Sequence, residues 1–230
     1  MKRRKRLTGF LLAFSMALLA LPPLPLAAQG DWQADAGWNV SADGNGPVFR
    51  LKDTTEAKIQ YTGAVGGADG IHISYDLAFD DPAVFTSSNI CLKLPADGVT
   101  QTTETWLFIR VQGGSNSILV QGQIQSENQW ETLFSTPDWV AGTGTSLRVE
   151  LNRQAGEDTL SFAVYSQGAD TAAYAAQVED ARLTGEKFYD KGLQLVLGSD
   201  SGAGIITYSN LHVGLPGGTE PPDEPDPVPV

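Results

Sequence analysis

The side chains that most suggest chemistry in this sequence are a histidine and two aspartates spaced four residues apart. His72, Asp76 and Asp80 occupy the more polar of two alternating sets of positions in the segment 71–80, as expected for one face of a β-strand. Residues four apart in a strand are separated by roughly 13 Å, whereas the two carboxylates of a retaining glycosidase are about 5–5.5 Å apart. We therefore interpret this face as solvated and not as a catalytic pair.

A second segment, 105–112, carries side chains that suit binding. Its apolar face consists of Leu107, Ile109 and Val111, and its other face of Trp106, Phe108, Arg110 and Gln112. Rings two residues apart along a strand are about 6.6 Å apart, which suits stacking on successive sugar rings. The next segment adds the amides of Gln121, Gln123 and Gln125, which can hydrogen-bond sugar hydroxyls. The alternative is that Trp106 and Phe108 are core residues of a strand covered on both sides.

Other reactive arrangements find little support. The only histidines are His72 and His212, and neither a Ser-His-Asp arrangement nor zinc-ligand spacing is present. The single cysteine, Cys91, cannot form an internal disulfide, and we expect it to be a small packed side chain. Trp130 and Trp139 are further candidates for an aromatic platform, although we expect core or loop packing to account for both.

Charge narrows the range of partners. The chain has 230 residues, with 27 acidic and 15 basic side chains and a formal net charge of -12. Nucleic acids and anionic membrane surfaces are held mainly by Lys and Arg. We therefore exclude nucleic acid as a partner.

The start of the chain has the pattern of a secretory signal peptide. The basic residues of MKRRKR precede a long apolar stretch that begins at Leu7 and ends in small residues. We expect cleavage after Ala28, followed by export without stable membrane insertion. The alternative is an uncleaved anchor; against it, prolines at 22, 23 and 25 interrupt the stretch before a span of about 20 residues is complete.

The remaining chain divides into a domain, 29–214, and a tail, 215–230. The tail is rich in proline and acidic residues, so we expect an extended, disordered linker or stalk. Within the domain, short segments of alternating polarity are separated by Gly, Asp, Asn and Pro clusters, and this pattern predicts about a dozen strands. The predicted strands are 48–51, 57–61, 71–80, 90–94, 105–112, 117–125, 130–134, 147–152, 160–165, 172–178, 193–197 and 205–213. Two short helices, 135–140 and 178–184, are also expected.

Half-buried alternation favours antiparallel sheets packed face to face. We therefore predict an all-β, antiparallel two-sheet jelly-roll sandwich. The closing segments Lys191–Gly198 and Ile205–Val213, with Gly202 between them, resemble the last strands of concanavalin A-like lectin/glucanase domains. The segments Gly37–Val40 and Tyr75–Phe79 fit the same pattern. The resemblance implies a jelly-roll fold whose members hydrolyse polysaccharides, bind glycans or mediate adhesion, often with a bound calcium ion.

The resemblance also frames two expectations about the site. Retaining glucanases of this superfamily carry a Glu-x-Asp-x-Glu triplet on one strand, and this sequence has no such triplet. A structural calcium ion has weak candidate ligands in Asp43, Asn45 and Asp200, although an ordinary hairpin turn explains the first two equally well.

The sequence therefore predicts a secreted or surface-associated, non-catalytic carbohydrate-binding module. Its candidate site comprises Trp106, Phe108, Arg110, Gln112, Gln121 and Gln123. Two alternatives remain open at this point. One is a structural or adhesive module that binds surface proteins, and the other is a polysaccharide hydrolase with an unrecognised carboxylate pair.

Overall fold

The computed structural model describes most of the predicted domain. The described residues are 27–29, 31–52, 57–63, 70–80, 86–93, 104–112, 117–126, 129–136, 138, 140–141, 146–157, 159–179, 194–199 and 205–216. The predicted signal peptide up to residue 26 and the tail from residue 217 lie outside these ranges. The expected cleavage point after Ala28 falls within a short strand, β1. Among the described residues no helix is long and apolar enough to cross a bilayer.

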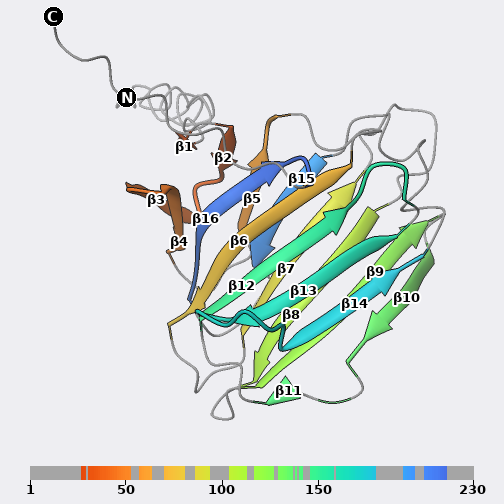
Figure 1. The fold of residues 1–230 in the computed structure, drawn as a ribbon. Helices are drawn as coiled ribbons and strands as arrows, with labels where there is room; N and C mark the ends of the chain where they lie inside the picture. Colours follow the sequence, from red (N-terminus) through yellow and green to blue (C-terminus); the bar gives the residue numbers. More distant parts are fainter. Residues whose placement is uncertain are drawn as a thin grey trace, which may run out of the picture.

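All described strands pair antiparallel in two sheets, which confirms the predicted all-β sandwich. The first sheet has nine strands, in the order β1 (Ala27–Gln29), β2 (Trp32–Ala34), β5 (Ala57–Tyr61), β15 (Gln194–Ser199), β7 (Thr86–Lys93), β8 (Glu104–Gln112), β9 (Ser117–Ser126) and β10 (Gln129–Ser135), with β11 (Val140–Ala141) also paired to β9. The second has seven, in the order β14 (Tyr174–Val178), β13 (Leu160–Ser166), β12 (Ser146–Arg153), β6 (Ile71–Phe79), β16 (Ile206–Gly214), β4 (Gly46–Leu51) and β3 (Trp38–Asp43). Figure 1 shows the two sheets as stacked layers, with β6, β12 and β13 lying across β7, β8 and β9.

The core lies between the two layers and follows from the alternation in the strands. In β6 the residues at odd positions, from Ile71 to Phe79, are at most 4% exposed, while those at even positions are half-buried. The facing sheet contributes Ile90 and Leu92 from β7 and Leu107 and Ile109 from β8. Complete burial of such side chains contributes about 1.5–3 kcal/mol each, so hydrophobic packing holds the layers together without a crosslink.

A polar contact also joins the two layers through the core. The Tyr208 hydroxyl, on β16, donates a hydrogen bond of 2.7 Å to the carbonyl of Gly198, on β15. Because this uses the only proton of the phenol, the Ser88 hydroxyl on β7 donates to the Tyr208 oxygen. The Tyr75 ring packs edge-on against Tyr208 at 5.5 Å, and its hydroxyl lies near Ser88 but hydrogen-bonds to no described residue.

At the opposite end of the sandwich an aromatic ring packs over a glycine. A bulge in β10 between Thr132 and Phe134 brings Phe134 opposite Gly122 of β9. A Cβ atom at Gly122 would lie 2.4 Å from a ring carbon of Phe134, so only glycine leaves room for this ring. Phe134 also contacts Phe162 of the other sheet, with ring centroids 6.1 Å apart. This packing closes the end of the core.

One predicted helix is wrong, and the other lies largely outside the described residues. Ser135 ends β10 and Val140 begins β11, so the segment 135–140 connects two strands. The Thr136 amide within it donates to the Val120 carbonyl, which extends strand-like pairing past the end of β10. In the second segment Val178 ends β14, and residues 180–184 are not described.

Candidate functional site

The predicted binding residues lie on two neighbouring strands of the larger sheet. β8 and β9 pair so that Trp106 is opposite Gln123, Phe108 opposite Gln121 and Gln112 opposite Ser117. Leu107 and Ile109 of β8 belong to the core, so the alternation of the strand assigns positions 106, 108 and 110 to the outer face. Arg110 is half-buried, and the side chains of Trp106, Phe108 and Gln112 lie outside the described residues. The pairing therefore brings the predicted positions together.

The outer face continues onto β10, where the structure corrects one expectation. Trp130 is 50% exposed, so core or loop packing does not account for it. Its strand pairs it with Gln125, and directly paired residues share a face of the sheet. Gln123 donates a 3.5 Å hydrogen bond to the Thr132 hydroxyl. We name this surface the glutamine face and define it by Gln121, Gln123, Gln125, Trp130 and Thr132. Trp139 lies outside the described residues.

The centre of the same outer face is covered. Ser87, Asn89 and Cys91 of β7 alternate with core residues, yet each is at most 6% exposed. Cys91 is buried, which confirms the expectation of a packed thiol. The glutamines of β9 are half-exposed. Among the described residues, an accessible part of this face therefore begins at Arg110 of β8 and extends across β9 to the sheet edge at β10.

The outer face of the smaller sheet carries the histidine and aspartates of β6, and each takes part in a local contact. Asp76 accepts a 2.6 Å hydrogen bond from the Asn210 side-chain amide, and Asp80, just after β6, pairs with Arg50 of β4. His72 packs against His212 of β16 with ring centroids 5.4 Å apart. Burial and, secondarily, this neighbouring imidazole lower the pKa of His72.

Metal binding gains no support from the described residues, in which no group of three His, Cys, Asp or Glu side chains is placed to hold an ion. The Asp43 carboxylate accepts a 2.8 Å hydrogen bond from the backbone N–H of Asn45 within the turn between β3 and β4. Gly46, which follows, has a φ of 124°, a conformation that glycine adopts without strain. The hairpin turn therefore accounts for Asp43 and Asn45, and Asp200 lies outside the described residues.

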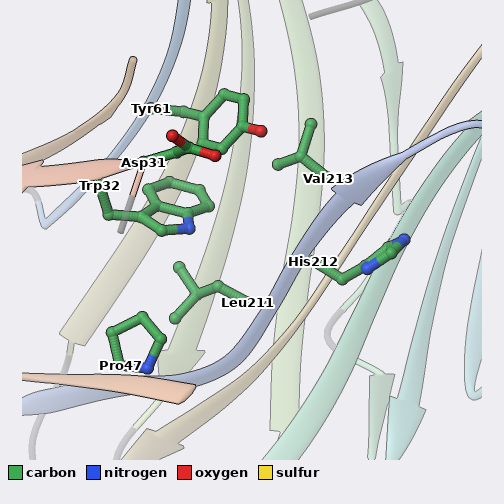
Figure 2. A pocket seen from close by; sticks show the side chains of 7 residues that line it. All are labelled: Asp31, Trp32, Pro47, Tyr61, Leu211, His212 and Val213. Carbon is green, nitrogen blue, oxygen red and sulfur yellow. The ribbon is translucent and has the colours of Figure 1, made fainter. Parts of the chain in front are cut away.

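A pocket of about 380 Å³ opens where the edges of the two sheets meet. Its lining comes from β2, β4, β5 and β16 and consists of Asp31, Trp32, Pro47, Tyr61, Leu211, His212 and Val213. The rings of Trp32 and Tyr61 pack at 5.0 Å with a 59° tilt. In Figure 2 the Asp31 carboxylate lies beside Tyr61, Leu211 points toward Trp32, and the His212 imidazole points away from the pocket.

A bulge in β16 shapes one wall of this pocket. Ser209 pairs with Asp76 and His212 with Ser74, so that two residues of β16 lie opposite the single residue Tyr75 of β6. Asn210, one of the two, has a φ of 50°, in the left-handed region that asparagine tolerates better than most residues. The extra residue reverses the faces of the strand beyond it, which places Val213 opposite the core residue Ile73.

No protein-family model matches the sequence, and no curated protein matches it. Several solved structures are nevertheless similar in fold. The carbohydrate recognition domain of Emp46p, in a potassium-bound form, has a TM-score of 0.55 at 10% identity, over 80% of this chain and 88% of that chain. The corresponding domain of Emp47p has a TM-score of 0.53 at 10% identity, over 81% and 89%. A legume lectin-like domain from Entamoeba histolytica has a TM-score of 0.50 at 8% identity, over 84% and 88%.

The fold is that of the concanavalin A-like lectins and glucanases. At these identities the likeness concerns the backbone alone, so the site of this chain has to be argued from its own residues.

Sequence reasoning missed two features of this domain. Trp130 was weighed as a packing residue because its strand shows little alternation, and its exposure follows from β10 being an edge strand. The pocket was missed because Asp31, Tyr61 and Leu211 come from segments far apart in the chain. The apolar positions of β16 shift from Ile206 and Tyr208 to Leu211 and Val213 across Ser209 and Asn210, and this shift was the signal that could have indicated the bulge.

Proposed function

We propose that this protein is an exported, non-catalytic carbohydrate-binding module that holds its ligand on the glutamine face and the adjoining positions of β8. One observation carries the proposal: the half-exposed indole of Trp130 shares a face with three half-exposed glutamines. The flat apolar surface of this ring matches the C–H face of a sugar ring.

The neighbouring side chains supply the polar half of such a site. Each glutamine amide offers two N–H donors and one carbonyl acceptor, which suits sugar hydroxyls because they both donate and accept. Gln121, Gln123 and Gln125 alternate along β9 and are therefore about 6.6 Å apart, a spacing that allows contacts with successive parts of an extended chain. Arg110, and the positions 106, 108 and 112 on β8, extend this surface toward the centre of the sheet.

Charge selects among polysaccharides. The chain carries a formal net charge of -12, and like charges repel at long range. We therefore expect neutral polysaccharides to bind better than acidic ones, and binding to depend little on salt.

Export and domain boundaries complete the proposal. A signal peptide over 1–28 directs the chain out of the cytoplasm, a sandwich over 29–214 binds the ligand, and residues 215–230 form an extended linker or stalk. The absence of a Glu-x-Asp-x-Glu triplet and the local contacts of Asp76 and Asp80 support a role in binding over one in hydrolysis.

The test is binding of purified protein to a panel of neutral and acidic polysaccharides by affinity electrophoresis. Trp130→Ala should weaken binding to a recognised polysaccharide by about tenfold or more, as loss of a central aromatic contact does. Its free energy of unfolding should change by less than about 0.5 kcal/mol because the side chain is exposed. Leu215→Ala is the matched control, since Leu215 is the other large exposed apolar residue described, at 54%.

Three results would count against the proposal. If no polysaccharide of the panel retarded the protein, the proposed ligand class would be wrong. Equal binding by Trp130→Ala and Leu215→Ala would remove the site. Release of reducing ends from any member of the panel would replace a binding module with a hydrolase.

A further inference from the structure

The pocket between the sheet edges has a chemical character unlike that of the glutamine face. Its walls are aromatic and aliphatic, formed by Trp32, Tyr61, Leu211, Val213 and Pro47. Asp31 is the only carboxylate in the lining, and no lysine or arginine is found among the lining residues that the structure describes. The pocket therefore combines one carboxylate with aromatic and aliphatic side chains, and most of the surface that it exposes is polar.

The carboxylate acts on the neighbouring phenol. Burial and, secondarily, the negative charge of Asp31 raise the pKa of Tyr61. Tyr61 therefore stays protonated and neutral at physiological pH, and its hydroxyl is a donor and acceptor beside the charge. A second donor is the indole N–H of Trp32, a side chain only 5% exposed whose nitrogen lies on the side toward β16 in Figure 2.

These groups define the ligand that complements them. A cation satisfies Asp31 and is attracted to the faces of aromatic rings. Hydroxyl groups pair with the phenol and the indole N–H, and a saturated carbon skeleton packs on Leu211 and Val213. The volume of about 380 Å³ is near the lower end for small-molecule pockets, about 300–1,000 Å³, so a single ring fits better than a polymer segment.

We propose that this pocket binds a small hydroxylated ammonium ligand, namely an amino sugar whose amine is free and protonated. The amine lies against Asp31, and the ring lies between the aromatic wall and the β16 wall. The site is separate from the glutamine face, which is formed by β9 and β10 near the other edge of the same sheet. The inference therefore does not depend on the proposed polysaccharide site.

The test is isothermal titration of the purified protein with glucosamine, glucose and N-acetylglucosamine at neutral pH. Only glucosamine carries a positive charge, so it should bind at least about threefold more tightly than the two neutral sugars. Asp31→Asn should weaken glucosamine binding about two- to fivefold, a range appropriate to a charge pair at an exposed carboxylate. Leu211→Trp should abolish binding by filling the pocket.

Matched variants keep the outcome interpretable. Asp170→Asn removes one exposed carboxylate from the turn between β13 and β14 and should leave glucosamine binding unchanged. Trp130→Ala should also leave it unchanged, and it separates failure of this inference from failure of the polysaccharide site. Thermal unfolding of each variant shows whether it is folded.

Equal affinities for the three sugars would overturn the inference. So would glucosamine binding that survives both Asp31→Asn and Leu211→Trp in folded protein. Glucosamine binding that is lost in Trp130→Ala but kept in Asp31→Asn would assign the amine to the glutamine face and refute the pocket site.

Discussion

Replacing Tyr208 by Phe, and separately Tyr75 by Phe, removes the same hydroxyl group from two neighbouring rings in the core. Both rings are at most 1% exposed and they touch edge to face. Among the described residues only the Tyr208 hydroxyl finds hydrogen-bond partners, Gly198 and Ser88 on the facing sheet. The two substitutions therefore isolate the energetic value of a hydrogen bond between layers from that of a buried hydroxyl.

The expected effects have opposite signs. Tyr208→Phe leaves the Gly198 carbonyl and the Ser88 hydroxyl without this partner, and an unsatisfied buried group costs about 1–3 kcal/mol. Tyr75→Phe removes a hydroxyl that gains no hydrogen bond from any described residue, so the free energy of unfolding should stay the same or rise by about 1 kcal/mol. The two variants should differ by about 2 kcal/mol.

Urea unfolding followed by tryptophan fluorescence measures both variants. The midpoint should fall for Tyr208→Phe and hold or rise for Tyr75→Phe, with an unchanged dependence on urea. In thermal unfolding, each 1 kcal/mol corresponds to about 2–4 °C for a domain of this size. Equal losses in the two variants would refute the reasoning, because the loss would then reflect packing of the rings and not the hydrogen bond across the core.

Three further predictions concern packing and pH. Gly122→Ala should lower the free energy of unfolding by about 1–3 kcal/mol because its Cβ would overlap the Phe134 ring, and an unchanged melting temperature would contradict that packing. His72→Gln should reduce the loss of stability between about pH 7 and pH 5. The pKa of His72 is lowered in the folded protein, so protonation below the unfolded value of about 6.5 favours the unfolded chain. Identical pH profiles for variant and parent in urea unfolding would count against this reasoning. Above about pH 10 stability should fall as pH rises, since burial raises the pKa values of Tyr75 and Tyr208 and the unfolded chain releases these protons first. Alkaline titration followed by circular dichroism should show that the stability of Tyr208→Phe depends less on pH in this range than that of the parent.

Strands of the core were predictable because burial on one face leaves a period of two. In β6 and β12 every second residue is buried, and both strands were expected at nearly their observed bounds. β3 was missed because it lies at a sheet edge and only Trp38 among its residues is buried, so its alternation is weak. β2, with three residues, is too short for a period to appear.

The site was less predictable because it depends on which strands become neighbours. The pairing of β8 with β9 joins consecutive segments, so the glutamines could be assigned to the same surface as Arg110. Exposure of Trp130 depends on the order of strands in the sheet, which no local pattern encodes. The pocket combines residues near position 31 with residues near position 211, and only the folded chain brings them together.

The bulge in β16 also bears on how such a chain could diversify. Removing Asn210 would place Leu211 opposite Tyr75 and keep His212 opposite Ser74, so the pairing beyond it would survive the deletion. Leu211 would then pair in register with β6, and the wall of the pocket that it forms would shift. A single codon could thus reshape the recess at the rim of the sandwich while the scaffold stays the same.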